Sequence, residues 1–155
     1  MKVTMLLADA AQEVGGKLFI LGGGWSQTGP DPSPFAIAIK LEVPWDRANH
    51  PYKLLLELLD ADGEPVQLPV GPEGPPGPIR LEMNFEAGRP PGLPPGTPLD
   101  GAMAINFSPL PLDTGRRYQW RLTVDGRDDE DWTLGFNVRP RPIVPSAPAS
   151  SQPGG

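Results

Sequence analysis

Strict alternation of apolar and polar side chains in five separate segments constrains this fold more than any other feature of the sequence. In residues 35–43, FAIAIKLEV, every odd position carries a large apolar side chain. The same period of two recurs in residues 79–86, 103–107, 118–124 and 132–138. This is the period of a strand with one buried face, and a polar second face is typical of antiparallel sheets. We therefore predict an all-β, antiparallel domain.

Less regular apolar runs predict three further strands, at residues 3–8, 17–21 and 52–61. The last run carries five leucines and could form a short helix. We predict a strand because Asp62-Gly63 follows it directly, and Asp-Gly is a hairpin-turn signal. Residues 66–70 can then return as the second strand of that hairpin.

Eight or nine strands spaced about ten residues apart predict a β-sandwich of immunoglobulin-like or related topology. Residues 112–124 support it, because a turn precedes a Tyr that enters a late strand. The spacing departs by one residue from the usual Asp-x-Gly-x-Tyr pattern, so it does not fix the topology. No segment shows a sustained helical period, and only residues 8–14 could supply a helical turn.

Pro and Gly, 23 and 19 of the 155 residues, make up more than a quarter of the chain, a composition at which disorder becomes a concern. They concentrate in residues 69–98 and 140–155. We expect stiff proline-rich loops in the first stretch. We expect a disordered tail in the second, because it is too poor in apolar residues to offset the entropy of ordering. The predicted organisation is a β-sandwich domain over residues 1–139 and a disordered tail over residues 140–155.

The charge and the absence of Cys exclude several classes of function. A net charge of −6 disfavours contact with phosphate backbones, so we expect no nucleic-acid partner. A chain with no Cys has no disulfide, thiolate nucleophile or Cys-based zinc site. The apolar stretch at residues 5–8 is too short for the core of a signal peptide, and no run approaches the ~18 residues of a membrane span. The expected compartment is the cytoplasm, without membrane association.

Catalytic and metal-binding constellations are equally poorly supported. The only His, His50, lies in a polar turn, so Ser/His and Cys/His schemes rest on a single residue. The acidic stretches 60–64 and 128–131 could bind calcium if their loops met at one end, but neither has EF-hand spacing, and solvated turns are the simpler interpretation. We expect no catalytic residue, no metal site and no cofactor.

A Gly-rich turn and a Pro-Trp-Asp turn are the most distinctive short motifs. GGGW at residues 22–25 is followed by neither Lys-Ser/Thr nor a helix, which disfavours a phosphate-binding loop. Each Trp follows a strand-like run, and we expect both rings to emerge at the same end of the sandwich beside open backbone donors. The predicted ligand or partner contacts are Gly22, Gly23, Gly24, Trp25, Trp45 and Asp46. Alternatively, the two rings cap the ends of the core.

The motifs LLADAAQ, GKLFILGGGW and PWD, followed later by YQWRL, resemble a family of short uncharacterised bacterial proteins, a domain of unknown function. The resemblance extends over residues 1–140. It implies a bacterial, cytoplasmic, stand-alone β domain and brings no catalytic residue with it.

We therefore expect a non-enzymatic binding or assembly module whose partner is a protein. The contact could use a sheet face, an edge strand or the Gly/Pro-rich loops. The alternative is a small carbohydrate-active or hydrolytic protein that uses Asp or Glu residues near Trp25 and Trp45. That alternative requires two carboxylates within about 10 Å in an aromatic-lined cleft. The identity of the partner and the oligomeric state stay open.

Overall fold

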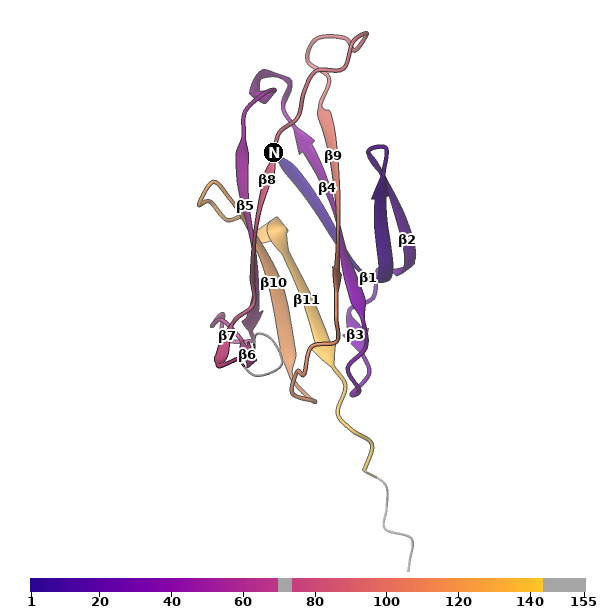
Figure 1. Cartoon of the computed structure of the whole chain (residues 1–155), viewed down its shortest axis with the longest axis vertical. Helices are drawn as coiled ribbons and strands as arrows, with labels where there is room; N and C mark the ends of the chain where they lie inside the picture. Colours follow the sequence, from indigo (N-terminus) through magenta and orange to yellow (C-terminus); the bar gives the residue numbers. More distant parts are fainter. Residues whose placement is uncertain (70–73, 144–155) are drawn as a thin grey trace, which may run out of the picture.

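The alternating segments form strands of two facing sheets in the computed structural model, which describes residues 1–69 and 74–143 (Figure 1). All strand pairs in these sheets are antiparallel except the short parallel pair of β3 with β11. The first sheet has the order β2-β1-β4-β9 and the second the order β3-β11-β10-β5-β8, while β6 and β7 form a separate ribbon. The strands are β1 (Lys2–Val14), β2 (Lys17–Gly23), β3 (Gln27–Thr28), β4 (Phe35–Val43), β5 (Tyr52–Asp60), β6 (Gln67–Pro69), β7 (Pro76–Pro78), β8 (Arg80–Phe85), β9 (Leu99–Phe107), β10 (Arg117–Val124) and β11 (Thr133–Val138). The predicted all-β, antiparallel class is confirmed.

The core lies between the two sheets and is built by the predicted alternation. Odd positions of β4, such as Ile37, face even positions of β10, and Trp120 at the centre is completely buried. The Trp120 ring packs against Phe107, with ring centroids 4.9 Å apart. Burial of each large apolar side chain contributes about 1.5–3 kcal/mol, so this interface supplies most of the driving force for folding.

Two local contacts hold parts of the sandwich together: one joins a turn to β10, and the other joins the edge strands β8 and β9. The Tyr118 hydroxyl accepts a hydrogen bond of 3.0 Å from the backbone N–H of Asp113, which ties the turn before β10 to the strand itself. Gly101 in β9 lies against the ring of Phe85 in β8. That ring occupies the space that a side chain at residue 101 would need. The absence of a side chain at residue 101 therefore lets one edge of each sheet approach the other.

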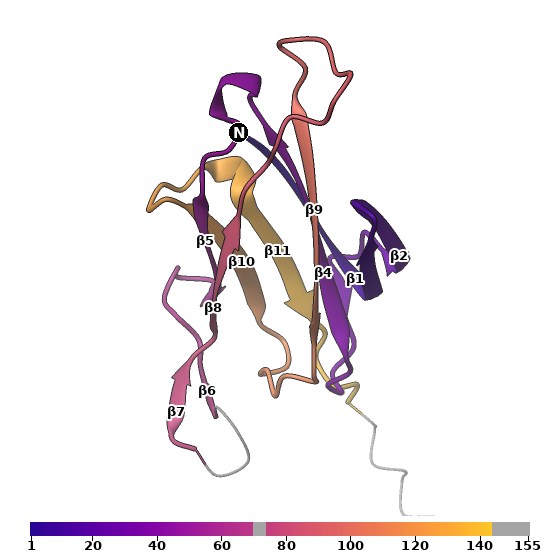
Figure 2. The ribbon, with the colours of Figure 1, turned by 45° about the horizontal axis from the view of Figure 1, so that its top comes forward.

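Short 3-10 helices and loops occupy the two ends. The helix η1 (Trp45–Arg47) lies beside the Pro-rich loop of residues 86–98 at one end, and the β6–β7 ribbon lies toward the other (Figure 2). A second 3-10 helix, η2 (Glu130–Trp132), precedes β11. Within the described residues, no helix is long and apolar enough to cross a membrane.

Residues 8–14, the one segment that could have supplied a helical turn, form strand instead. This segment is the second half of β1, because Gly15 and Gly16 adopt positive φ angles of 60° and 78° and turn the chain back into β2. Two consecutive positive φ angles are what a tight two-residue hairpin requires. β1 is therefore about twice as long as predicted.

The predicted tail is described only in part. Residues 140–143 continue beyond β11, and Arg141 forms an ion pair of 2.9 Å with Asp31. Residues 144–155 lie outside the described residues, as do residues 70–73 of the first Pro-rich stretch.

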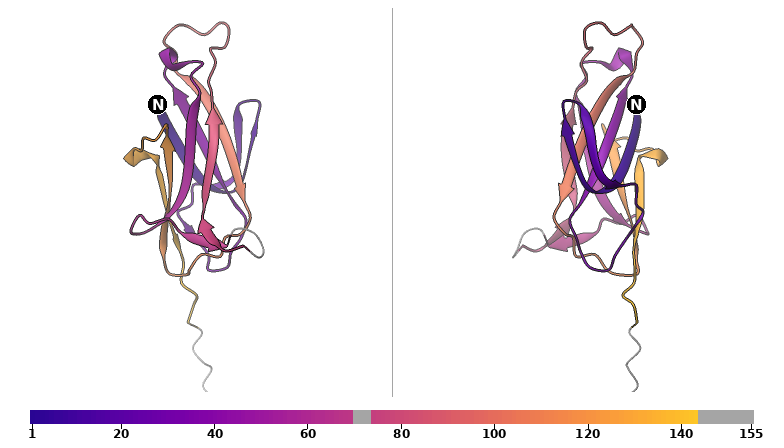
Figure 3. Two further views of the ribbon diagram at one scale, coloured as in Figure 1. Left: turned by 60° about the vertical axis from the view of Figure 1, so that its left-hand side comes forward. Right: turned by 90° about the vertical axis from the view of Figure 1, so that its right-hand side faces the viewer.

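The β1–β2 hairpin curls over the outer side of the first sheet. β1 pairs with β4 through residues 2–8 and with β2 through residues 8–14. The side-chain amide of Asn106 in β9 holds the second half in place, since it donates to the Ala11 carbonyl at 2.9 Å and accepts from the Ala11 N–H at 3.4 Å. Figure 3 shows the hairpin standing at the outer side of the sheet.

Candidate functional site

Trp25 lies against the end of the core at which β4 begins. Its ring packs edge-on against Phe35 and Phe136, with centroids 6.4 Å apart in both pairs. The side chain is half-buried, and the buried indole N–H has no hydrogen-bond partner among the described residues. Trp25 therefore packs against the core at this end of the sandwich, and only part of its ring faces solvent.

Trp45 lies in η1, directly after β4, and is covered by the Pro-rich loop. The Arg89 guanidinium stands 4.7 Å from the centre of the Trp45 ring. The same group donates two hydrogen bonds, of 3.1 Å from Nε and 2.8 Å from Nη2, to the Trp45 carbonyl oxygen. Asp46, the next residue, is exposed. One face of the Trp45 ring is thus already occupied by a cation.

The two tryptophans lie at opposite ends of the sandwich, so the expectation that they emerge together is wrong. Trp25 contacts Phe35, the first residue of β4, and Trp45 comes two residues after its last, Val43. Nine strand residues span about 30 Å. β2 and β4 do run in the same direction. However, Ala8 of β1 pairs with Gly23 at the end of β2 and with Ala36 near the start of β4. This stagger separates the two rings.

The glycines of the Gly-rich turn permit close packing within the hairpin. Gly22 has a φ of 59°, and the Asp9 carboxylate occupies the space that a side chain at residue 22 would fill. A side chain on Gly23 would collide with Ile20. The N–H of Gly24 donates to the Leu7 carbonyl at 2.7 Å and is therefore not open to a ligand. Contact of Gly22, Gly23 and Gly24 with a partner stays a prediction.

His50 is half-exposed and joins two loops. Its Nε2 lies 3.3 Å from Asp125 Oδ2, and its ring stands edge-on to Tyr52. The N–H of Lys53 donates to Asp125 Oδ1 at 2.8 Å, and this bond, followed by the one to His50, holds the pKa of Asp125 below its usual value. Burial raises the pKa of Tyr52. These contacts connect the β10–β11 turn to the start of β5.

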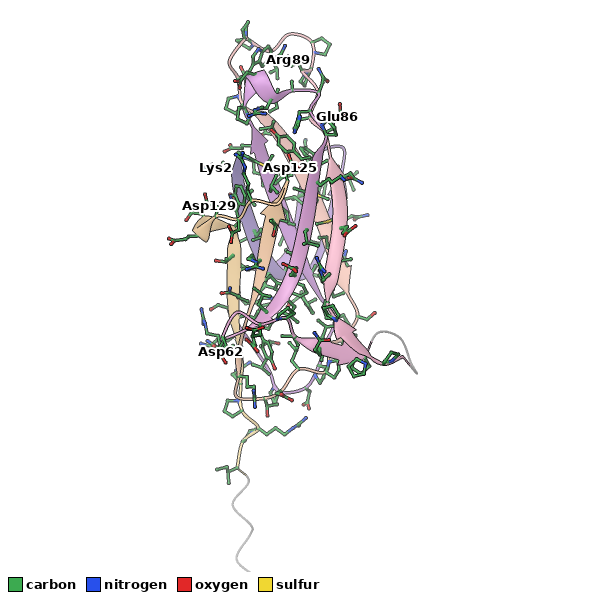
Figure 4. The ribbon with its side chains drawn as sticks, turned by 90° about the vertical axis from the view of Figure 1, so that its left-hand side faces the viewer. Lys2, Asp62, Glu86, Arg89, Asp125 and Asp129 are labelled. Atoms are coloured by element: carbon green, nitrogen blue, oxygen red, sulfur yellow. The ribbon has the colours of Figure 1, made fainter. Side chains whose placement is uncertain are left out.

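The two acidic loops do not meet. Asp60 pairs with Tyr118 near the start of β10, whereas residues 128–131 follow its end. Figure 4 shows Asp62 and Asp129 far apart along the molecule. Within the part of the chain that the structure describes, no group of three or more His, Asp or Glu side chains could hold a metal ion. A calcium site would have to be formed by one loop alone.

The β1–β2 hairpin exposes an apolar surface that the predicted site did not include. Phe19 is 57% exposed, Leu21 71% and Val14 51%. The cross-strand pairs Gln12–Phe19 and Val14–Lys17, together with the alternation of β2, place these three side chains on one face of the hairpin. We call Val14, Phe19 and Leu21 the hairpin patch.

The opposite face of the hairpin packs against the domain. Leu18 contacts a cluster of buried alanines, Ala11, Ala36 and Ala38, on the outer side of the first sheet. β2 is also the last strand of that sheet and has β1 as its one neighbour among the described strands. The hairpin therefore combines an exposed apolar face with an open strand edge.

A family model matches nearly all of the residues that form the two sheets. The model of a family of unknown function, DUF6941, matches residues 3–137. The chain belongs to this family. The DUF6941 region runs from the second residue of β1 to the penultimate residue of β11, so the β1–β2 hairpin is part of the family domain. No curated protein matches the chain.

One sequence signal could have identified the hairpin patch in this DUF6941 domain. Residues 18–21, LFIL, form an apolar run without alternation, unlike the runs of β4, β8 and β10. A strand that is apolar on both faces needs a cover on both faces. The Gly-Gly-Gly-Trp motif that follows directly is more conspicuous, and our prediction relied on it instead.

Proposed function

We propose that the domain is a non-enzymatic, protein-binding or assembly module that works through its β1–β2 hairpin. The observation that carries the proposal is the hairpin patch, three large apolar side chains exposed together on an edge hairpin. Of the seven exposed large apolar side chains in the described residues, five lie in β1 or β2. Concentrated exposure of this kind marks interaction surfaces rather than ordinary surface scatter.

The open edge of β2 supports the same function. An unpaired edge strand offers a row of backbone N–H and C=O groups, and an added strand satisfies them. Burial of a side chain such as Phe19 or Leu21 contributes about 1.5–3 kcal/mol. A partner that adds a strand to β2 and covers the hairpin patch therefore gains both hydrogen bonds and apolar contact. The cytoplasm of a bacterium stays the expected setting.

Site-specific photo-crosslinking in cells of the source organism tests the proposal. Benzoylphenylalanine in place of Phe19 should give an adduct of one defined mass, because this side chain lies inside the interface. Adding Leu21→Glu should abolish the adduct. The matched control carries the same crosslinker in place of Glu82, an exposed residue of β8, and should give none. Absence of an adduct at residue 19, or equal adducts at both positions, would contradict the proposal.

One observation favours the carbohydrate-active alternative as a second candidate. Glu42, Trp45 and Asp46 line a shallow hollow between the N-terminus and the Pro-rich loop. Two contacts weaken it. The Glu42 carboxylate lies within 3.8 Å and 3.7 Å of the ammonium groups of Lys2 and Lys40, and Arg89 covers one face of the Trp45 ring. The test is hydrolysis of a panel of aryl glycosides. Turnover that is lost in Glu42→Gln would support this candidate, and no turnover would eliminate it.

A further inference from the structure

A small pocket opens at the end of the core where β4 begins, and we call it the end pocket. Most of its lining is apolar and comes from Trp25, Phe35, Leu110, Leu112, Phe136 and Val138. Its volume of about 40 Å³ leaves room for about one aliphatic side chain, whereas sites for small molecules and cofactors measure ~300–1,000 Å³. The end pocket therefore fits a side chain of a protein better than a free ligand.

The segment that follows β11 runs along one wall of the end pocket. Thr28 and Asp31 belong to this wall. The backbone N–H of Arg139 donates to the Thr28 carbonyl at 3.0 Å, and the Arg141 guanidinium donates to an Asp31 carboxylate oxygen at 2.9 Å. The chain is thus tied to the pocket wall at two points shortly before Ile143, the last described residue.

Ile143 is an apolar side chain without cover. It is 93% exposed, more than any other large apolar side chain in the described residues. It lies four residues after Arg139, and four residues span at most about 14 Å. Because the backbone bond of Arg139 is made on the pocket wall, Ile143 is close enough for the chain to turn back over the pocket. Val144 and Pro145, the next residues in the sequence, are apolar as well.

The end pocket also has an unused hydrogen-bond donor. The Trp25 indole N–H is buried and has no acceptor among the described residues. Leaving such a donor unpaired is unfavourable, because it has lost its hydrogen bonds to water. A chain segment seated in the pocket brings backbone C=O groups to this ring, and one of them can accept the bond. The pocket thus suits a peptide segment in its polar as well as its apolar part.

The contact between Arg141 and Asp31 positions the segment but does not hold it firmly. The two side chains are 63% and 81% exposed, and exposed ion pairs contribute little to stability. Burial of the Ile143 side chain removes apolar surface from water and supplies a further attraction. Closure over the pocket is therefore reversible, and it depends mainly on the apolar contact.

We infer that residues 143–145 of this chain form a strap that closes the end pocket, with the Ile143 side chain among Trp25, Phe35 and Phe136. The strap does not involve the β1–β2 hairpin, so the inference goes beyond the proposed function. While the strap is seated, the end pocket is closed to other molecules. A side chain of another protein enters only after it displaces Ile143.

Methyl NMR of the full chain tests the strap. The Ile143 Cδ1 methyl signal is the one lost in Ile143→Val. In the wild type it should show an upfield ring-current shift and nuclear Overhauser contacts with the aromatic protons of Trp25, Phe35 and Phe136. Ile143→Asp should shift the Trp25 indole N–H signal, which is the one lost in Trp25→Phe. The control Leu93→Asp changes an exposed apolar side chain of the Pro-rich loop and should leave the indole signal in place.

Each other outcome overturns the inference. An Ile143 methyl signal at its random-coil shift, without contacts to the three rings, shows that the strap stays open. An indole signal that Ile143→Asp leaves in place, or that Leu93→Asp shifts equally, shows that Ile143 does not fill the pocket. In a mixture of isotope-labelled and unlabelled chains, contacts from a labelled methyl to unlabelled rings would assign the pocket to the tail of another copy. The crosslinking at Phe19 is unaffected by these results, so the proposed function is tested separately.

Discussion

β2 and β10 are both short, apolar strands, but the apolar side chains of β10 are buried and those of β2 are not. In β10 every second side chain is buried, and Trp120 is inaccessible to solvent. In β2 no residue is buried, although four consecutive side chains are apolar. β10 lies between β11 and β5 and faces the first sheet, whereas β2 has a single neighbour. Apolar content alone therefore does not place a strand in the core, because burial depends on what lies over each face.

The difference is also one of pattern. Alternation in β10 provides one face for the core and one for solvent, and both are satisfied within the domain. The unbroken apolar run of β2 provides two apolar faces. Leu18 on one face packs on the alanine cluster, and the hairpin patch on the other remains uncovered. The exposed apolar face of such a strand is removed from water only when another molecule covers it.

The largest expected effect compares the two strands directly. Trp120→Ala should lower the free energy of unfolding by about 3–5 kcal/mol, because it leaves a cavity at the centre of the core. Phe19→Ala should change the stability of the monomer by less than about 0.5 kcal/mol, because its ring is largely in solvent. Both are measured by urea unfolding of the purified full chain. A loss for Phe19→Ala as large as that for Trp120→Ala would show that the hairpin patch belongs to the core.

A smaller effect tests how the hairpin is attached. Asn106→Ala removes both hydrogen bonds to Ala11 and leaves its partly buried N–H and C=O without partners, which should cost about 1–3 kcal/mol. Amide hydrogen exchange should accelerate in the β1–β2 hairpin and stay unchanged in β10, because the opening is local. The control Asn137→Ala removes only an exposed contact to Arg117 and should leave exchange in the hairpin unaltered. Uniform acceleration throughout the chain would argue against a separately attached hairpin.

The smallest effect concerns pH and the loops next to β10. The folded state lowers the pKa of Asp125, so its contribution to stability is fully present above about pH 4 and is lost as the pH falls through the lowered pKa. Asp125→Asn keeps an acceptor for the Lys53 N–H but has no charge. The difference in melting temperature between wild type and this variant should therefore shrink on acidification from pH 5 to pH 2. Melting curves that stay parallel over this interval would show that the Asp125 charge does not stabilise the fold.

Much of the fold could be predicted from particular residues, but the candidate site could not. Alternation in β4 and β10 was enough to assign their buried faces, and Asp62-Gly63 was enough to choose a strand for the leucine-rich run. The covering of Trp45 could not be foreseen, because Arg89 is 44 residues away in the sequence and a cation–π contact leaves no local pattern. The partial exposure of β2 was missed because it depends on how far the hairpin curls, which Asn106 in β9 controls.

The sequence by itself determined the strands and their faces, because side chains alternate along a strand and the apolar ones must leave water. Only the tertiary structure decided which strand ends lie together. β2 and β4 pair with different halves of one long β1, and this stagger put Trp25 and Trp45 at opposite ends of the sandwich. The same stagger carried β2 beyond the cover of the second sheet. Stagger between strands is set by packing between segments distant in sequence, and that is why the apolar run of β2 could not show which of its two faces the domain would leave exposed.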